Sequence, residues 1–257
     1  MNRITRVAPT IASLLGVEKF TDASAMDEVT SLAEGGRVDR VLMYNPDAVA
    51  WWIFEKYNDM FAADLELDPL VLKMESVMPS VTPVCFASMY SGLMPDGHGI
   101  KSYTKPVLSC ETIFDALIKA GLKPAICSTG NDSISLIFKE RDMDYFIVDT
   151  PDQANEKAIE LLKENRHDLI VVYNGNYDGE MHGCGPEGEK AIAALEHNIA
   201  AYRELYETAK KEWGGRGLKF AAAFATDHGC HEIDGKRGSH GLDMDEDMHV
   251  VHMWKMG

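Results

Sequence analysis

The chain has 257 residues, of which 46% are hydrophobic and 26% charged, a composition typical of a folded globular protein. Lysine and arginine number 25 against 41 aspartate and glutamate residues, which gives a formal net charge of −16. Without any run of basic residues, such a surface is expected to repel nucleic acid and anionic membranes. Neither is therefore expected as a partner.

The five cysteines are odd in number and never form a C-x-x-C pair, which argues against a disulfide framework and a zinc ribbon. A reducing, cytoplasmic location is expected. No run of 18 apolar residues occurs, so no membrane span is predicted. The apolar run from Ala8 to Val17 follows two arginines as in a secretory signal. Pro9 and Thr10 interrupt it, so we do not expect a signal peptide.

Short apolar runs alternate with helical patterns along the chain. The predicted elements, in chain order, are a strand at 38–44, helices at 51–61, 82–90 and 112–120, a strand at 123–127, a helix at 133–139, a strand at 145–148, a helix at 154–165, a strand at 168–173, a helix at 187–213 and a strand at 218–225. This alternation predicts an α/β fold, a three-layer α/β/α sandwich around a mostly parallel sheet. No linker or repeat divides residues 1–257, so a single domain is predicted.

Polar side chains follow three of the predicted strands. Asp47 comes after the first, Asp178 and His182 after the strand at 168–173, and Asp227 and His228 after the strand at 218–225. Ligands of parallel sheets bind outside the carboxyl ends of the strands, and these side chains offer the oxygen and nitrogen atoms that divalent metals bind. Taken singly, Asp47 could cap a helix and the others could be solvated or incidental. Their joint occurrence favours a metal site.

Thr82-Pro83 fits the start of a helix, with threonine at the N-cap and proline at the first helical position. The hydroxyl could serve only as a cap. Alternatively it lies at the positive end of the helix dipole, where amide groups favour an alkoxide and a phosphoryl group. Spacing alone leaves both interpretations open.

The motifs, taken in order, resemble the alkaline phosphatase superfamily, and within it the type I phosphodiesterase and nucleotide pyrophosphatase branch. The resemblance rests on Asp47, T-P-V-C-F-A-S-M-Y-S-G-L-M-P-D-G-H-G-I at 82–100, D-x-x-x-H at 178–182, T-D-H-G at 226–229 and G-S-H-G at 238–241. It implies an alkaline-phosphatase-like fold and a site for two divalent metals, zinc or alternatively manganese. Thr82 matches the nucleophile, which would be phosphorylated during turnover.

The other implied roles belong to metal ligands: Asp178, His182 and His240 for one ion, and Asp47, Asp227 and His228 for the other. His231 lies three residues after His228 and is an alternative to His240. His98 is expected to pack in its loop. The implied function is metal-dependent hydrolysis of a small-molecule phosphoester, a diester or a monoester. The alternatives are a non-catalytic metal- or ligand-binding protein on this scaffold, and a sulfatase-like or phosphonate-hydrolysing member of the superfamily.

Three features depart from the pattern of that branch. The chain is short, so the cap insertions that shape substrate pockets are expected to be reduced. Tyr103 stands where relatives often place a phosphate-binding asparagine, and it is predicted to bind substrate, with Lys101 or Lys105 as an accompanying cation. Residues 7–17 resemble a segment that relatives carry near their C-terminus. An N-terminal helix is therefore expected to occupy that position in space.

Overall fold

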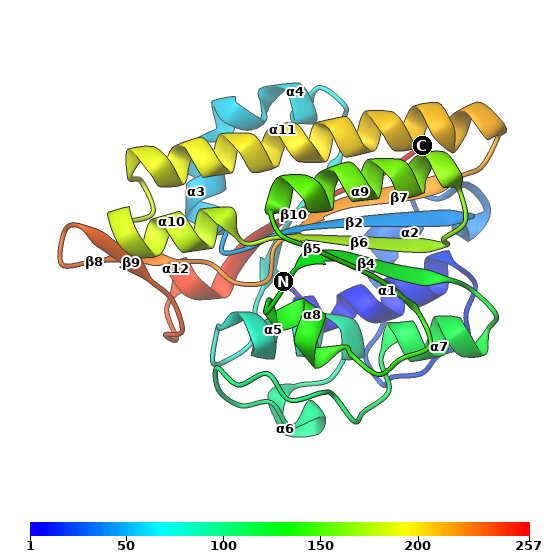
Figure 1. The fold of residues 1–257 in the computed structure, drawn as a ribbon, viewed down its shortest axis with the longest axis horizontal. Helices are drawn as coiled ribbons and strands as arrows, with labels where there is room; N and C mark the ends of the chain where they lie inside the picture. The colour runs from blue at the N-terminus through cyan, green and yellow to red at the C-terminus, as the bar shows by residue number, and fades with distance from the viewer.

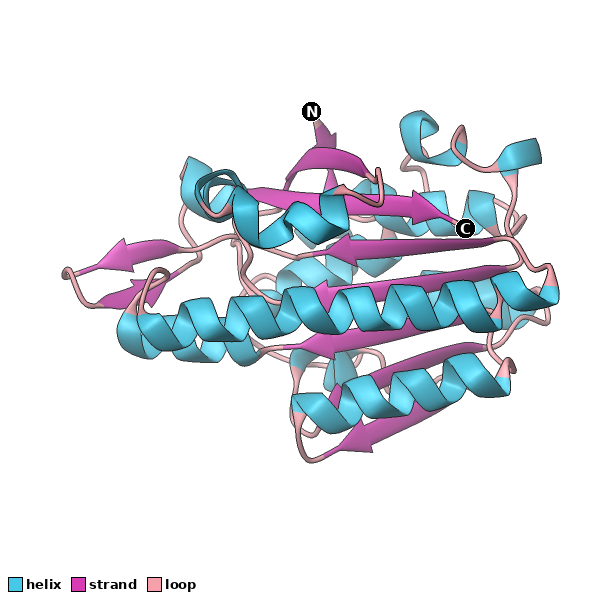
Figure 2. Ribbon diagram, turned by 90° about the horizontal axis from the view of Figure 1, so that it is seen from above, coloured by secondary structure: helices cyan, strands magenta, loops and turns pink.

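A sheet of eight strands forms the middle layer of the structure, a computed structural model that describes residues 1–257 (Figure 1). In spatial order the strands are β1 (Asn2–Arg3), β3 (Leu70–Glu75), β10 (His249–Met256), β7 (Phe220–Ala225), β2 (Arg40–Pro46), β6 (Leu169–Asn174), β4 (Pro124–Thr129) and β5 (Asp144–Val148). Every pair is parallel except those of β10, which runs antiparallel to both β3 and β7 (Figure 2). The predicted mostly parallel sheet is confirmed.

Helices cover both faces of this sheet, as Figure 1 shows. One face carries α1 (Val7–Leu14), α2 (Asp27–Thr30), α5 (Thr82–Ser91), α7 (Ile113–Lys119) and α8 (Ser133–Ile137). The other carries α3 (Trp51–Lys56), α9 (Pro151–Glu164), α10 (Asn176–Cys184) and α11 (Glu189–Glu212). The remaining short elements are α4 (Ala62–Leu65), α6 (Pro95–His98), α12 (Asp245–Met248), the hairpin β8 (His231–Ile233) and β9 (Arg237–Ser239), and the 3-10 turns η1 (Ile4–Arg6), η2 (Glu34–Gly36), η3 (Asn58–Phe61) and η4 (Gly214–Arg216).

The central strands are apolar along their whole length because both of their faces are buried. In β2, Val41 and Met43 join the core beneath α1 and α5, whereas Leu42 and Tyr44 join the core beneath α9 and α11. The same alternation holds in β6 and β7. Burial on two faces explains why these strands read as continuous hydrophobic runs rather than alternating ones.

Helix α5 is buried at every residue, Thr82 to Ser91. Its sequence has no polar face, which fits a helix enclosed on all sides. It ends at Gly92, whose φ of 74° places it in the left-handed region that glycine adopts without strain. Helix α1 packs against α5 and α7 in the same core, so an N-terminal helix does occupy a buried position. None of the helices is both long enough and apolar enough to cross a membrane.

Several elements differ from the sequence prediction. The predicted helix at 51–61 ends at Lys56, and the chain continues as η3, where Asn58 and Asp59 favour a turn over a helix interior. The region after β6, for which no helix was predicted, forms α10. Strands β3 and β10 were not predicted. In β10, His249, His252 and Lys255 interrupt the apolar pattern.

Candidate active site

Three neighbouring strands end at one edge of the sheet and bring the predicted metal ligands together. Strands β6, β2 and β7 are adjacent and parallel, so their carboxyl ends coincide. Asp47 directly follows β2, and its amide donates to the carbonyl of Asn174 at the end of β6 over 3.0 Å. The next amide, of Ala48, donates to Asp227 Oδ1 over 3.4 Å. The turn after β2 is thereby tied to both neighbouring strand ends.

Two groups of potential metal ligands lie at this edge. Asp178, His182 and His240 form one group, and Asp47, Asp178 and His228 form the other; within each group the ligand atoms lie within 4.8 Å of one another. Asp178 Oδ1 is 3.4 Å from Nε2 of both His182 and His240. Asp227 Oδ2 lies 3.4 Å from His228 Nε2, beside the second group. All six predicted ligands are therefore neighbours, with Asp178 common to both groups.

The three histidines among the predicted metal ligands are oriented in the same way. Each Nδ1 lies within hydrogen-bond distance of a backbone carbonyl: His182 with Gly238 at 3.1 Å, His228 with Gly229 at 2.9 Å, and His240 with Ser80 at 2.9 Å. A carbonyl can only accept, so Nδ1 carries the proton in each ring. The Nε2 atoms, which face the carboxylates, then keep the lone pair that a metal binds.

The three carboxylates at this edge lack donors for part of their oxygens. Asp47 Oδ1, Asp178 Oδ1 and Asp227 Oδ2 are buried and accept no hydrogen bond. Burial, together with the charges of Asp227 and Asp178, raises the pKa of Asp47 well above its usual range. Burial also raises the pKa of Asp227. Buried carboxylates without donors are costly unless a cation neutralises them. The residues present therefore fit divalent metals.

The pKa values of Asp178 and His240 depend on burial and on the neighbouring histidines. Burial opposes ionisation of Asp178, but its contact with His182 and the neighbouring rings of His228 and His240 outweigh burial and lower the pKa of Asp178. Burial, and then His228, lowers the pKa of His240 to about 3. Its ring stacks on that of His228, with centroids 4.0 Å apart. His240 is thus held neutral, the form that binds a metal.

The Thr82 hydroxyl points into this cluster. Its Oγ1 lies 3.3 Å from Asp47 Oδ2 and 3.2 Å from His228 Nε2. The prediction that Thr82 is the N-cap is wrong: Val81, with an extended backbone, is the N-cap of α5, and Thr82 is the first helical residue. The partners of Thr82 Oγ1 are Asp47 and His228 rather than a backbone amide of the helix, so a purely capping role does not account for it. Asp47 likewise does not cap α3, whose N-cap is Ala50.

Tyr173 is a residue of the site that sequence reasoning missed. Its hydroxyl donates to Asp47 Oδ2, which leaves Asp47 Oδ1 facing His228 at 3.2 Å. Tyr173 is the penultimate residue of β6, and its ring packs edge-on against Phe86. In sequence it is one more apolar residue of a buried strand, and no signal separates it from the core.

Tyr103 lies in the loop after α6, with 59% of its surface exposed. Burial of part of the ring, and then the charges of Asp47 and Asp178, raise the pKa of its hydroxyl. Lys105 Nζ lies 5.3 Å from the ring centroid and donates to the Asn131 carbonyl over 2.7 Å. Lys101 instead pairs with Asp96 at 2.6 Å. Of the two predicted cations, Lys105 is therefore the one associated with Tyr103.

Two further histidines have partners of their own. His231 Nδ1 lies 2.7 Å from Asp247 Oδ1, and His231 belongs to neither ligand group. His98 bonds Ser88 Oγ through Nε2 over 2.9 Å, while its Nδ1 accepts from the Ile100 amide over 3.2 Å. This packing role agrees with the expectation for His98.

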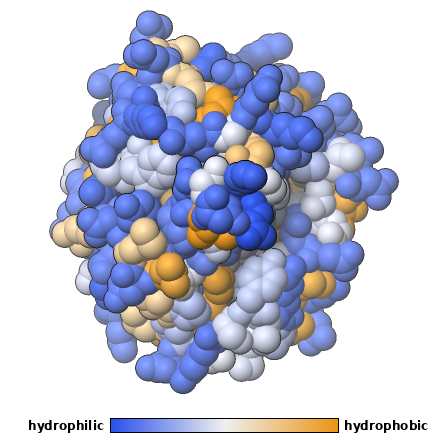
Figure 3. Space-filling model, turned by 90° about the vertical axis from the view of Figure 1, so that its left-hand side faces the viewer, coloured by the Kyte–Doolittle hydropathy of each residue, from blue (hydrophilic) through white to orange (hydrophobic).

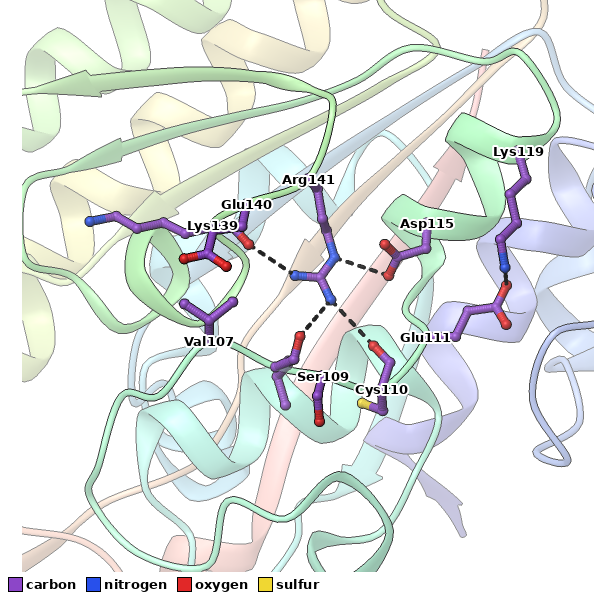
Figure 4. A pocket seen from close by; sticks show the side chains of 10 residues that line it. Val107, Ser109, Cys110, Glu111, Asp115, Lys119, Lys139, Glu140 and Arg141 are labelled. Atoms are coloured by element: carbon purple, nitrogen blue, oxygen red, sulfur yellow. Dashed lines mark hydrogen bonds and ion pairs between the residues drawn. The ribbon is translucent and has the colours of Figure 1, made fainter.

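A surface pocket of about 350 Å³ lies away from these ligands, around Arg141 (Figure 4). The guanidinium donates to Asp115 Oδ2 over 2.9 Å and to the carbonyls of Leu108, Cys110 and Lys139. These contacts hold together the loops that bear them. None of the predicted site residues lines this pocket.

The end of the molecule that carries α10, α12 and the β8–β9 hairpin is mostly hydrophilic (Figure 3). Its hydrophobic residues are seen only in small, separate groups.

Comparison with solved structures confirms the alkaline-phosphatase-like fold that the sequence resemblance implied. The periplasmic domain of phosphoethanolamine transferase EptC from Campylobacter jejuni matches with a TM-score of 0.62 and 15% identity, over 86% of this chain and 80% of that one. A second match is murine ectonucleotide pyrophosphatase/phosphodiesterase 5, solved as an inactive threonine-to-alanine variant in complex with AMP. It has a TM-score of 0.60 and 14% identity, over 76% of this chain and 58% of that one.

Phosphonoacetate hydrolase from Sinorhizobium meliloti 1021, in complex with phosphonoformate, matches with a TM-score of 0.56 and 18% identity, over 77% of this chain and 59% of that one. The chain thus spans less than two thirds of the length of the murine and Sinorhizobium structures. No family profile matches the sequence, and no curated protein matches it. These similarities establish the fold.

Proposed function

We propose that the protein is a metal-dependent phosphoester hydrolase in which Thr82 is the nucleophile. One observation carries this proposal: three histidine Nε2 atoms face three buried carboxylates that lack donors, next to the Thr82 hydroxyl. A structural role for these groups would leave their charges unbalanced. A binding protein without catalytic activity would not need a buried hydroxyl beside the predicted metal ligands.

Asp178, His182 and His240 would hold one divalent ion, and Asp47, Asp227 and His228 the other, with zinc or manganese as the expected metals. When bound, such ions polarise phosphoryl oxygens and favour ionisation of the nucleophile. Tyr173 holds one oxygen of Asp47 and leaves the other for the metal. Thr82 Oγ1, 3.3 Å from Asp47 Oδ2, can direct its proton toward that carboxylate.

In the proposed reaction Thr82 Oγ1 attacks phosphorus, and the bond from phosphorus to the leaving oxygen breaks. The phosphoryl group is then esterified to Thr82, and the leaving alcohol takes a proton. Water attacks the same phosphorus next, the Thr82 ester breaks and its hydroxyl is restored. The products are the alcohol and a phosphate, or a phosphomonoester when the substrate is a diester.

The structural neighbours support this proposal by what they act on or bind. One is named a phosphodiesterase and holds AMP in a variant that lost a threonine and is inactive. Another is a phosphonate hydrolase. We propose a small-molecule phosphoester as substrate, with Tyr103 as a binding residue in a single domain with reduced cap insertions. The five free thiols agree with the proposed cytoplasmic location.

Transfer to an acceptor other than water is a second candidate. The EptC domain is named a phosphoethanolamine transferase, and its alignment covers 86% of this chain and 80% of its own length. Hydrolysis and transfer share the Thr82 ester and differ only in what attacks it. Product analysis with and without added ethanolamine or other alcohols would separate them, because a transferase forms a new ester.

The direct test is turnover of p-nitrophenyl phosphate and its bis ester with zinc or manganese, for the wild type, Thr82→Ala and Thr82→Ser. We expect Thr82→Ala to lose at least about a hundredfold in kcat with metal content unchanged, because a covalent step disappears. Thr82→Ser keeps a hydroxyl and should retain measurable turnover.

A Thr82→Ala variant with more than about a tenth of the wild-type rate would show that another group attacks phosphorus. Lack of activity in the metal-loaded wild type would favour a non-catalytic protein. Circular dichroism of both variants controls for folding.

A further inference from the structure

Asp247, on the short helix α12, connects the two loops that carry predicted metal ligands. It is fully buried, and each of its carboxylate oxygens has a hydrogen-bond partner. Oδ1 lies 2.7 Å from His231 Nδ1, and Oδ2 accepts from the Leu242 amide over 2.8 Å. Its backbone carbonyl accepts from the Gly229 amide over 2.8 Å. One residue thus contacts the chain just after His228 and the chain just after His240.

The glycine of the T-D-H-G motif is what allows α12 to approach this closely. A Cβ placed on Gly229 would lie 2.0 Å from the backbone carbonyl oxygen of Glu246 and 3.0 Å from the Cβ of Ala50. Backbone cannot yield as a side-chain tip can, so only glycine fits between α12 and α3. The motif glycine therefore serves the contact with α12.

The loop carrying His240 has few other attachments near its imidazole. Ser80 contributes two contacts: its carbonyl pairs with His240 Nδ1 at 2.9 Å, and its Oγ donates to the Leu242 carbonyl over 3.4 Å. The Asp247–Leu242 bond is the shorter of the two that hold Leu242. Leu242 itself is 54% exposed, so packing of its side chain does not fix the loop.

We propose that Asp247, with His231, is a positioning residue that sets the spacing between the two metal-ligand loops. The role rests on the proposed metal site and acts through His228 and His240. His231, which the sequence offers as an alternative ligand, has its Nδ1 committed to Asp247 and holds that carboxylate in place. The loop after β7 and the loop after β9 then stay in register, with the His228 and His240 rings stacked.

The test is the affinity of the purified full-length chain for Zn²⁺, measured by competition with a chromophoric chelator, together with metal stoichiometry. Loss of an outer hydrogen-bond partner of a metal ligand typically weakens metal binding about 10- to 100-fold. Asp247→Asn puts an amide donor against the Leu242 N–H or the His231 N–H, so we expect at least a tenfold weaker affinity. Asp243→Asn is the matched control, because Asp243 is exposed and its substitution removes the same charge from the same loop.

His231→Phe is the second variant, because it breaks the contact with Asp247 without changing the number of carboxylates. We expect it to weaken Zn²⁺ binding several-fold, and it decides the question if Asp247→Asn does not fold. A merely structural role would lower the melting temperature of the metal-free and zinc-bound forms equally. The positioning role predicts a smaller rise in melting temperature on adding Zn²⁺.

Wild-type affinity in Asp247→Asn and in His231→Phe would overturn the positioning role while leaving the proposed function intact. A wild-type chain that binds no Zn²⁺ or Mn²⁺ would overturn both. Weaker binding in Asp243→Asn equal to that in Asp247→Asn would assign the effect to charge and also overturn it.

Discussion

Tyr103, which we propose binds substrate, stands where the phosphodiesterase branch that the sequence resembles often has an asparagine. Its hydroxyl is a single donor on a long, partly exposed side chain, and Lys105 lies over its ring. A preorganised donor to transition-state oxygens is typically worth about 2.7–4 kcal/mol. We expect Tyr103→Phe to lower kcat at least about tenfold with the metal content of wild type, measured by steady-state kinetics and elemental analysis. Unaltered kinetics would leave Tyr103 only a packing role.

At this scale the sequence indicates the residues that carry charge or a nucleophile, and little else. Asp47, Asp178 and Asp227 are recognisable because carboxylates rarely follow buried strands without a reason. Tyr173 and Asp247 are not recognisable. A tyrosine in a buried strand looks like core, and Asp247 lies in an acidic stretch that reads as solvated surface. Their roles depend on contacts between segments far apart in sequence.

Among the helices, the contact of α6 with α5 depends on a neutral histidine. Burial lowers the pKa of His98 to about 4, from 6.5. Between these pH values His98 therefore binds more protons in the unfolded chain than in the folded one. The contribution of His98 to stability is full above about pH 6.5 and falls as the pH drops toward 4. We expect His98→Asn to show a shallower loss of unfolding free energy than wild type over this range, measured by urea denaturation.

The quantity to compare is the difference in unfolding free energy between wild type and His98→Asn at each pH, because His252 is also buried and burial lowers its pKa to about 4. Both proteins contain His252, so its contribution cancels. Parallel pH profiles for the two proteins would show that His98 is not responsible. A steeper loss of unfolding free energy in His98→Asn than in wild type would contradict the sign of the argument.

The elements that the sequence predicts well are the central strands, which are buried on both faces, and the helices that pack on them. Strands β2, β4, β6 and β7 and helices α5, α9 and α11 all lie close to their predicted ranges. The missed strands lie on the other side of β7, where β10 carries histidines and a lysine and β3 is only partly buried. His252 Nε2 in β10 lies 2.7 Å from the Thr226 carbonyl, a partner visible only in the folded chain.

For the whole molecule, the excess of negative charge and the buried carboxylates lead to the same requirement. The chain carries a formal charge of −16, and three buried carboxyl groups, each with one oxygen that accepts no hydrogen bond, lie at one edge of the sheet. The predicted ligand set brings −3, whereas two divalent ions bring +4. The loaded site would therefore be net positive and could receive an anionic phosphate inside an acidic protein. The fold was accessible from sequence, but the contacts of Tyr173 and Asp247 beside the predicted ligands were not.

The same charge balance makes stability depend on metal. Metal that binds only the folded state stabilises it by mass action, by about 2.7 kcal/mol at a hundredfold excess over Kd. For a chain of this size that corresponds to about 5–10 °C in Tm. We expect excess EDTA to lower Tm of the purified protein by this order and zinc or manganese to restore it, measured by calorimetry. The reason is that Asp47, Asp178 and Asp227 repel one another once the cations leave, and Asp47 must then take up a proton to stay buried. An unchanged melting curve, with loss of metal verified by elemental analysis, would show that these carboxylates hold no stabilising ion.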